Sequence, residues 1–197
     1  LGALKDNSFV ERIGSSIGKH CKRMGIHINF APVVDINTNP KNPIIGNRSY
    51  GENKFNVTNK AVSFTKGIQS EGVLACAKHF PGHGDTSKDS HKTLPTITFK
   101  KKRILDVELY PYKLLIKEGL GSVMIAHLNV PSLESNINFP SSLSKNIVTS
   151  LLKERLKFKG LIITDALGMK GVTSYDKENI DLMAFKAGND VLLMSGD

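Results

Sequence analysis

This sequence is poor in cysteine and has no long apolar run. Neither Cys21 nor Cys76 has a second cysteine at C-x-x-C spacing, so we expect two buried free thiols. No apolar segment approaches the ~20 residues that a membrane-spanning helix needs. No low-complexity linker interrupts the chain, which predicts a single domain over residues 1–197.

The chain carries an excess of positive charge. It has 27 lysines and arginines against 18 aspartates and glutamates, which gives a formal net charge of +9. The basic residues are spread along the chain, and the densest cluster, FKKKR at 99–103, is short. A basic balance of this kind affects solubility and non-specific binding more than function, so we expect no nucleic-acid partner.

Short apolar runs alternate with helical patterns along the chain. Five runs are rich in β-branched residues or leucine, namely 27–34, 73–77, 122–126, 161–164 and 190–195. Between them, apolar residues recur at spacings of three and four, over 9–24, 57–68 and 147–156. Ser144 is placed to cap the last of these helices. A glycine falls between a helix and each of the five runs, where a C-cap glycine is expected: Gly25, Gly72, Gly121, Gly160 and Gly188.

This alternation predicts an α/β fold whose parallel strands are buried on both faces. Five βα units are too few to close an eight-stranded barrel, and the chain begins with a helix and stops just after a strand. We therefore expect part of a larger fold. An open doubly wound sheet is the alternative, although no glycine-rich phosphate loop follows any of the runs.

Polar residues follow four of the apolar runs directly. They are Asp35, the pair Lys78 and His79, His127, and Asp165. Parallel strands place their carboxyl ends on one face of a sheet or barrel, so these side chains are expected to converge. For Asp35 or His127 alone, a structural hydrogen bond is an equally good interpretation. For the four strand ends together, a functional site is the better one.

The segment KHFPGHGDTSKDSH, residues 78–91, combines three histidines with two aspartates. Three interpretations are open: a metal site, a proton-transfer site, or a polar surface loop. The donors available to a zinc ion are His79, His83, Asp85, Asp89 and His91. Against a metal, alignment of His79 and His83 would need a helix, which Pro81 and the flanking glycines disfavour.

Three motifs together resemble a known enzyme family. KHFPGHGDTSKDSH, FAPVVDINTNPKNPIIGNRSYG upstream and GLIITDALGM downstream are similar to the family 3 glycoside hydrolases. The most similar branch is the β-N-acetylglucosaminidases of the bacterial cell-wall recycling type, and the likeness runs over nearly the whole chain. It implies a (β/α)8 barrel, of which about five βα units are present here, and a retaining mechanism without a metal or cofactor.

The resemblance also assigns roles to individual residues. It implies that Asp165 is the nucleophile, that His91 is the acid/base and that Asp89 is its partner. It makes Arg48, Lys78 and His79 the sugar-contacting residues. These roles suit the chemistry, because a carboxylate at a strand end is rigidly held. An imidazole with a pKa near ~6.5 can give and then take a proton at neutral pH.

The expected substrate is a small carbohydrate, a GlcNAc-containing glycan or muropeptide, and a monomer is expected. The upstream D-x-E-G-G segment and the closing strand of the family are not found, so an inactive sugar-binding fragment stays open beside a metal-dependent hydrolase. The sequence begins with Leu1 and not with an initiator Met, which indicates a truncated N-terminus. The compartment therefore stays open between the cytoplasm, the periplasm and secretion from a bacterial cell.

Overall fold

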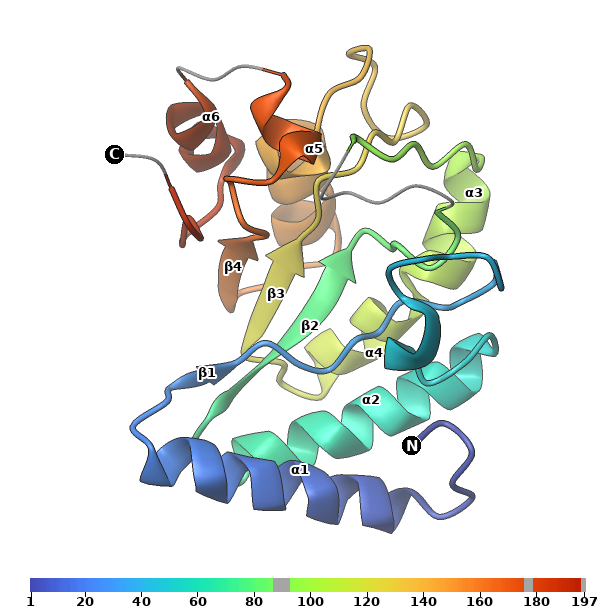
Figure 1. Ribbon diagram of the computed structural model, residues 1–197, viewed down its shortest axis with the longest axis vertical. Helices are drawn as coiled ribbons and strands as arrows, with labels where there is room; N and C mark the ends of the chain where they lie inside the picture. The colour runs from blue at the N-terminus through green and yellow to red at the C-terminus, as the bar shows by residue number, and fades with distance from the viewer. Residues whose placement is uncertain (87–92, 176–178, 196–197) are drawn as a thin grey trace.

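A computed structural model describes residues 1–86, 93–175 and 179–195 of the chain. Four strands, β1 to β4, lie parallel and in sequence order within this part of the chain. Figure 1 shows β2, β3 and β4 side by side, with α1 and α2 together below them. The strands are β1 (Ile28–Asn29), β2 (Leu74–Phe80), β3 (Ser122–Ile125) and β4 (Leu161–Thr164).

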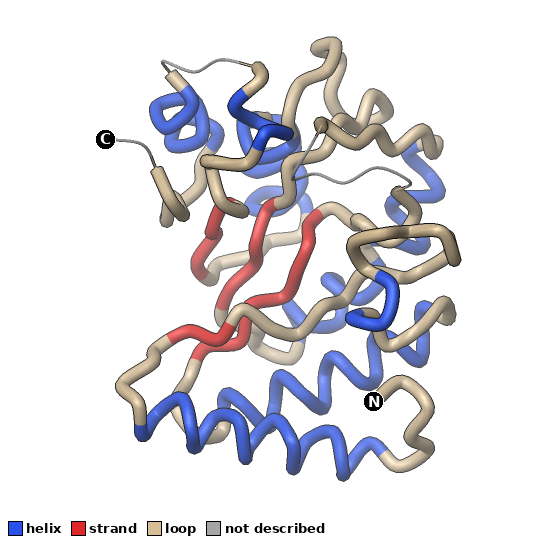
Figure 2. The backbone as a smooth tube through the Cα atoms, in the orientation of Figure 1, coloured by secondary structure: helices blue, strands red, loops and turns tan. Residues whose placement is uncertain are grey.

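Helical segments connect the strands, as Figure 2 shows in blue. The segments before β3 are α1 (Asn7–Arg23), η1 (Gly46–Arg48), α2 (Lys54–Gln69), α3 (Lys101–Arg103), η2 (Ile104–Glu108) and α4 (Tyr110–Lys117). Those after it are η3 (Ser141–Leu143), η4 (Asn146–Arg155), α5 (Lys170–Thr173) and α6 (Ile180–Ala187). The structure confirms the predicted α/β class with parallel strands. In the described residues, no helix is long and apolar enough to cross a membrane.

Short polar side chains fix where the helices begin. Asp6 accepts a hydrogen bond from the Ser8 amide at 2.8 Å, which caps α1. Asn53 accepts from the amides of the first turn of α2. Ser144 acts as predicted before η4, because its hydroxyl accepts from the Ile147 amide at 3.2 Å.

The two faces of the sheet belong to different apolar clusters, because side chains alternate along a strand. Ala75 and Ala77 of β2, Val123 of β3 and Ile162 of β4 pack in the large cluster with the helices. The opposite face carries a smaller cluster of Cys76, Met124 and Ile163, with Ile28 and Leu193 packed against it. An inner layer of this kind is what a parallel barrel places inside its wall. Both cysteines are free and buried, as predicted.

The prediction of a fifth strand over 190–195 is wrong, because this segment forms no regular strand. Val191 makes a single parallel bridge to Ile163 beside β4. Beyond it, the Leu193 amide bonds at 2.9 Å to the hydroxyl of Thr164, so a side chain takes the place of a ladder carbonyl. The first predicted strand is shorter than expected for a related reason. Pro32 has no amide N–H to donate, and pairing resumes at the bridge between Val33 and Lys78.

The glycine pattern was only partly predicted correctly. Gly25, Gly72 and Gly188 have positive φ angles of 75°, 79° and 108°, as expected after a helix. Gly160 serves packing instead, because a Cβ atom there would lie 2.4 Å from the Gly121 carbonyl oxygen. Two neighbouring helix-to-strand connections therefore touch through their main chains at this point.

Candidate active site at the strand ends

The carboxyl ends of the strands surround a cavity of about 220 Å³, here called the strand-end cavity. It is lined by Phe30, Ile44, Arg48, Lys78, His79, His83, Met124, Asp165 and Leu193. Four predicted site residues therefore meet in one place although they come from three distant segments of the chain. The predicted acid/base His91 and its partner Asp89 lie outside the described residues.

Asp35 lies behind the cavity and organises the end of β2. Its carboxylate is 2.7 Å from Nδ1 of His79 and accepts from the His83 amide at 2.7 Å. The His79 amide donates to both carboxylate oxygens at 3.2 Å. Burial acts to raise the pKa of Asp35, but the His79 ring and the contacts from His83 outweigh it and hold that pKa below its ordinary value.

Two cations face the cavity from neighbouring segments. Lys78 is on β2, and Arg48 ends η1, where its guanidinium donates to the Ile44 carbonyl at 3.2 Å. Burial lowers the pKa of Lys78 and the nearby Arg48 lowers it further, whereas Asp165 raises it. The two cations thus repel each other, and the Asp165 carboxylate compensates part of that repulsion.

Asp165 follows β4 and presents its carboxylate to the cavity. In the described part of the chain, its side chain accepts one hydrogen bond, from the adjacent Ala166 amide at 2.9 Å. Its own amide donates to the Ile125 carbonyl at 2.8 Å, which ties it to β3. The backbone is therefore held, and with respect to residues 1–86, 93–175 and 179–195 the carboxylate keeps most of its acceptor capacity.

His127, which follows β3, contacts the Asp165 segment from behind. It is fully buried, with Nε2 3.0 Å from the Ala166 carbonyl and Nδ1 2.7 Å from the Ser142 hydroxyl. A carbonyl can only accept, so Nε2 carries a proton. Burial lowers the pKa of His127, so the ring is neutral at pH 7 and Nδ1 accepts from Ser142. Sequence reasoning placed His127 at this edge but gave it no role.

His83 is a cavity residue to which sequence reasoning assigned no role in sugar binding. Its ring lies 5.9 Å from the His79 ring at a steep angle, and its Nδ1 is 2.7 Å from the Thr86 hydroxyl. Burial lowers the pKa of His83, and Asp35 acts in the opposite direction. Its position four residues after His79, in HFPGH, was the available signal.

The loop after β2 is bound to the loop after β1. Asn42 donates to the His83 carbonyl at 2.8 Å, and Thr38 donates to the Asp85 carboxylate at 3.0 Å. Asp85, a metal-ligand candidate from the sequence, therefore bonds to a hydroxyl. Within residues 1–86, 93–175 and 179–195, no three His, Cys, Asp or Glu side chains are grouped so as to hold a metal ion.

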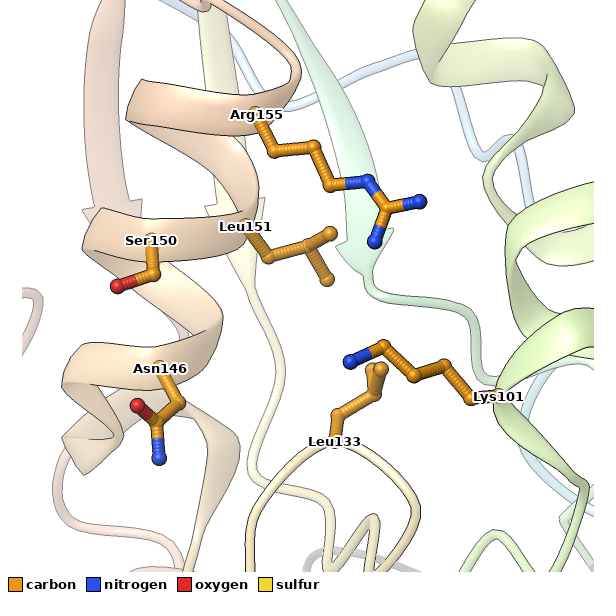
Figure 3. Close-up of a pocket in the computed structure, with 6 residues that line it drawn as sticks. All are labelled: Lys101, Leu133, Asn146, Ser150, Leu151 and Arg155. Atoms are coloured by element: carbon orange, nitrogen blue, oxygen red, sulfur yellow. The ribbon is translucent and has the colours of Figure 1, made fainter.

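A second hollow, here called the helix-side hollow, shows that size alone does not mark the site. It measures about 270 Å³ and is lined by Lys101, Leu133, Asn146, Ser150, Leu151 and Arg155. In Figure 3 the Lys101 and Arg155 side chains extend into the space between η4 and the segment that carries Lys101. Neither a carboxylate nor an imidazole lines this hollow, whereas the strand-end cavity has both.

Parallel strands with a carboxylate, two cations and two imidazoles at their carboxyl ends define a domain of the (β/α)-barrel type. The whole chain, residues 1–197, matches the glycosyl hydrolase family 3 N terminal domain, and the protein belongs to that family.

Named relatives agree with this assignment. The chain is 38% identical to beta-hexosaminidase A of Pseudoalteromonas piscicida over 197 residues, covering 94% of this chain and 33% of that protein. A family 3 beta-N-acetylglucosaminidase from Paenibacillus sp. str. FPU-7 superposes with a TM-score of 0.94 at 39% identity, covering 98% of this chain and 37% of that one. The beta-glucoside phosphorylase BglX superposes with a TM-score of 0.96 at 29% identity, covering 100% and 37%. The chain thus spans about a third of the length of each.

Proposed function

We propose that the protein is a retaining glycosidase that removes terminal non-reducing β-N-acetylglucosamine from a glycan or muropeptide. The observation that carries this proposal is the open carboxylate of Asp165 in a cavity shared with Arg48, Lys78 and His79. The names of the relatives, beta-hexosaminidase and beta-N-acetylglucosaminidase, support the choice of sugar.

In this mechanism Asp165 is the nucleophile. Its carboxylate oxygen attacks the anomeric carbon as the glycosidic C–O bond breaks, and a covalent glycosyl-aspartate forms. The leaving oxygen takes a proton from His91, with Asp89 holding the imidazole. Water then gives a proton back to His91 and its oxygen displaces Asp165 from the anomeric carbon. The roles of His91 and Asp89 rest on the family motif, since both lie outside the described residues.

Arg48 and Lys78 would donate hydrogen bonds to sugar hydroxyls. Their side chains are cationic, acceptor-free and directed to the same cavity as the nucleophile. Held in this way, a sugar ring presents one face to Asp165, and such positioning supplies a large part of the rate enhancement of many enzymes. The partly buried position of Lys78 strengthens its bonds, because fewer water molecules compete for the ammonium group.

The test is hydrolysis of 4-nitrophenyl N-acetyl-β-glucosaminide by the purified protein and by its Asp165→Ala variant. We expect activity in the first and its loss in the second, with partial rescue by azide, which takes the place of the missing carboxylate. Wild-type activity in the Ala variant would exclude Asp165 as the nucleophile. Sugar binding without turnover in the unmodified chain would indicate a sugar-binding domain that does not catalyse.

Two further arms separate the remaining alternatives. Because a structural neighbour is a phosphorylase, product should be analysed with and without inorganic phosphate; a sugar 1-phosphate would show that phosphate replaces water. Activity that is lost on chelation and restored by zinc would favour the metal-dependent hydrolase.

A further inference from the structure

The network around Asp35 bears on how the strand-end cavity recognises a hydroxyl group. The Asp35 side chain is fully buried, and its described partners are the ring Nδ1 and the amide of His79 on β2 and the amide of His83 in the loop that follows. All three are hydrogen-bond donors or can act as one. The carboxylate does not line the cavity itself, but His79, which it holds, does.

The proton on the His79 ring is determined by this contact. An ionised carboxylate only accepts hydrogen bonds, so the 2.7 Å contact requires a proton on Nδ1. Both carboxylate oxygens of Asp35 accept from main-chain amides, and hydrogen bonds donated to a carboxylate favour its ionised form. In a neutral imidazole with a proton on Nδ1, the other nitrogen, Nε2, has a lone pair and accepts.

Asp35 also fixes the surrounding segments. Its main-chain carbonyl accepts from the Ser49 hydroxyl at 2.6 Å, one residue beyond Arg48. The neighbouring Val34 amide donates to the Lys78 carbonyl at 2.8 Å. The residues around Asp35 therefore connect the two segments that carry Arg48 and the pair Lys78 and His79, so a displacement of Asp35 would move both.

We propose that Asp35 is a positioning residue that holds His79 in the Nδ1–H tautomer, so that Nε2 accepts a hydrogen bond from a sugar hydroxyl in the cavity. Lys78 and Arg48 can only donate, and His79 then supplies the complementary acceptor. The cavity thereby selects a ligand whose hydroxyl donates at that point. This inference deepens the proposed function and rests on it only for the identity of the ligand.

The tautomer can be measured without any ligand or turnover. We expect ¹⁵N NMR of the histidine rings at pH 7 to show a protonated Nδ1 and an unprotonated Nε2 for His79. Two protonated nitrogens would mean an imidazolium paired with Asp35 and would overturn the proposal. This outcome is independent of hydrolysis, so failure of the proposed function and failure of this inference are distinguishable.

The acceptor role is tested with N-acetylglucosamine and analogues that carry fluorine in place of each hydroxyl in turn. Fluorine cannot donate, so at one position the dissociation constant should rise at least about tenfold, as when a site's polar group is left unpaired. In the Asp35→Asn variant the side-chain amide can donate to Nδ1 of His79, which places the ring proton on Nε2 instead. The same fluorine replacement should then raise the dissociation constant by less than about threefold. An unchanged preference in the variant would contradict the proposal.

The matched control is Asp85→Asn in the loop after β2, the loop that also carries His83. Asp85 bonds to Thr38 and has no described bond to His79, so this variant should leave the tautomer and the analogue preference unchanged. A loss of preference in both variants would indicate a general loosening of the loop and would count against a specific role of Asp35. If Asp35→Asn does not fold, the NMR measurement on the unmodified protein still decides.

Discussion

Two aspartates at the same edge of the sheet have opposite environments. Asp35 is 1% exposed and accepts from the ring and amide of His79 and from the amide of His83. Asp165 is partly exposed, lines the strand-end cavity and, within the described residues, accepts from its neighbouring amide alone. A saturated, buried carboxylate can orient its neighbours but cannot reach a substrate. An open one can attack. The hydrogen bonds that each carboxylate accepts, and not its residue type or its position at a strand end, distinguish Asp35 from Asp165.

The largest effect in this comparison is expected for Asp165→Asn. The amide cannot act as the nucleophile, so kcat/KM should fall by about 10³-fold or more, in the range seen for loss of a catalytic carboxylate. The free energy of unfolding should stay within about 0.5 kcal/mol, because few contacts are lost. Assay kinetics and urea denaturation measure the two quantities. Asp106→Asn, an exposed aspartate paired with Lys102, is the control and should change neither.

The reverse pattern is expected for Asp35→Ala. Two amides and a ring nitrogen would be left buried without their acceptor, which costs about 3–5 kcal/mol when a buried charged partner is removed. Urea denaturation should show this loss of stability, and Asp165→Ala should not show it. Equal stability of the two Ala variants would remove the structural distinction between the aspartates.

His127 supports Asp165 from behind through the carbonyl of the next residue, Ala166. His127→Ala should lower activity by about 10- to 100-fold, as is typical when a supporting hydrogen bond behind a functional residue is removed. The Ala166 carbonyl would lose its donor, and the orientation of the adjacent Asp165 would be less well defined. His127→Gln, which can still donate, should recover part of kcat, whereas His127→Met, of similar volume without a donor, should not; equal recovery in both would indicate a packing role.

The smallest expected effect is a pH dependence of stability in two separate windows. The pKa values of His83 and His127 are lowered by burial, so the unfolded chain takes up protons first and stability begins to fall below about pH 6.5. Asp35 has a lowered pKa as well, so its contribution is complete above about pH 3.9 and is lost as pH falls through its folded pKa. Urea midpoints from pH 7 to pH 3 should show both steps, and Asp35→Asn should remove the lower one.

Local patterns predicted most of the fold. Helical spacing located α1, α2 and η4 to within a few residues, and the apolar runs located β2, β3 and β4. The errors fall where main-chain pairing is interrupted. Pro32 lacks a donor, and the amide of Leu193 bonds to the Thr164 hydroxyl. Pro32 was visible within the run itself, whereas the bond between Leu193 and Thr164 joins residues far apart in the chain and no local pattern reveals it.

The candidate site likewise contains residues that the sequence predicted and residues whose roles it did not reveal. Strand-end position predicted Lys78, His79 and Asp165, and the family motif added Arg48; the structure brings all four to one cavity. It did not assign roles to Asp35, His83 and His127, because their roles depend on which donors reach them. Asp35 is the clearest case, since its partners lie more than forty residues away in sequence.

The sequence by itself determined the alternation of helices and parallel strands, and with it the edge at which polar side chains gather, because apolar periodicity and strand direction are local properties. Only the tertiary structure decided which of the two aspartates is open to a ligand. That choice follows from burial and from donors supplied by other segments, which exist only after the strands have paired.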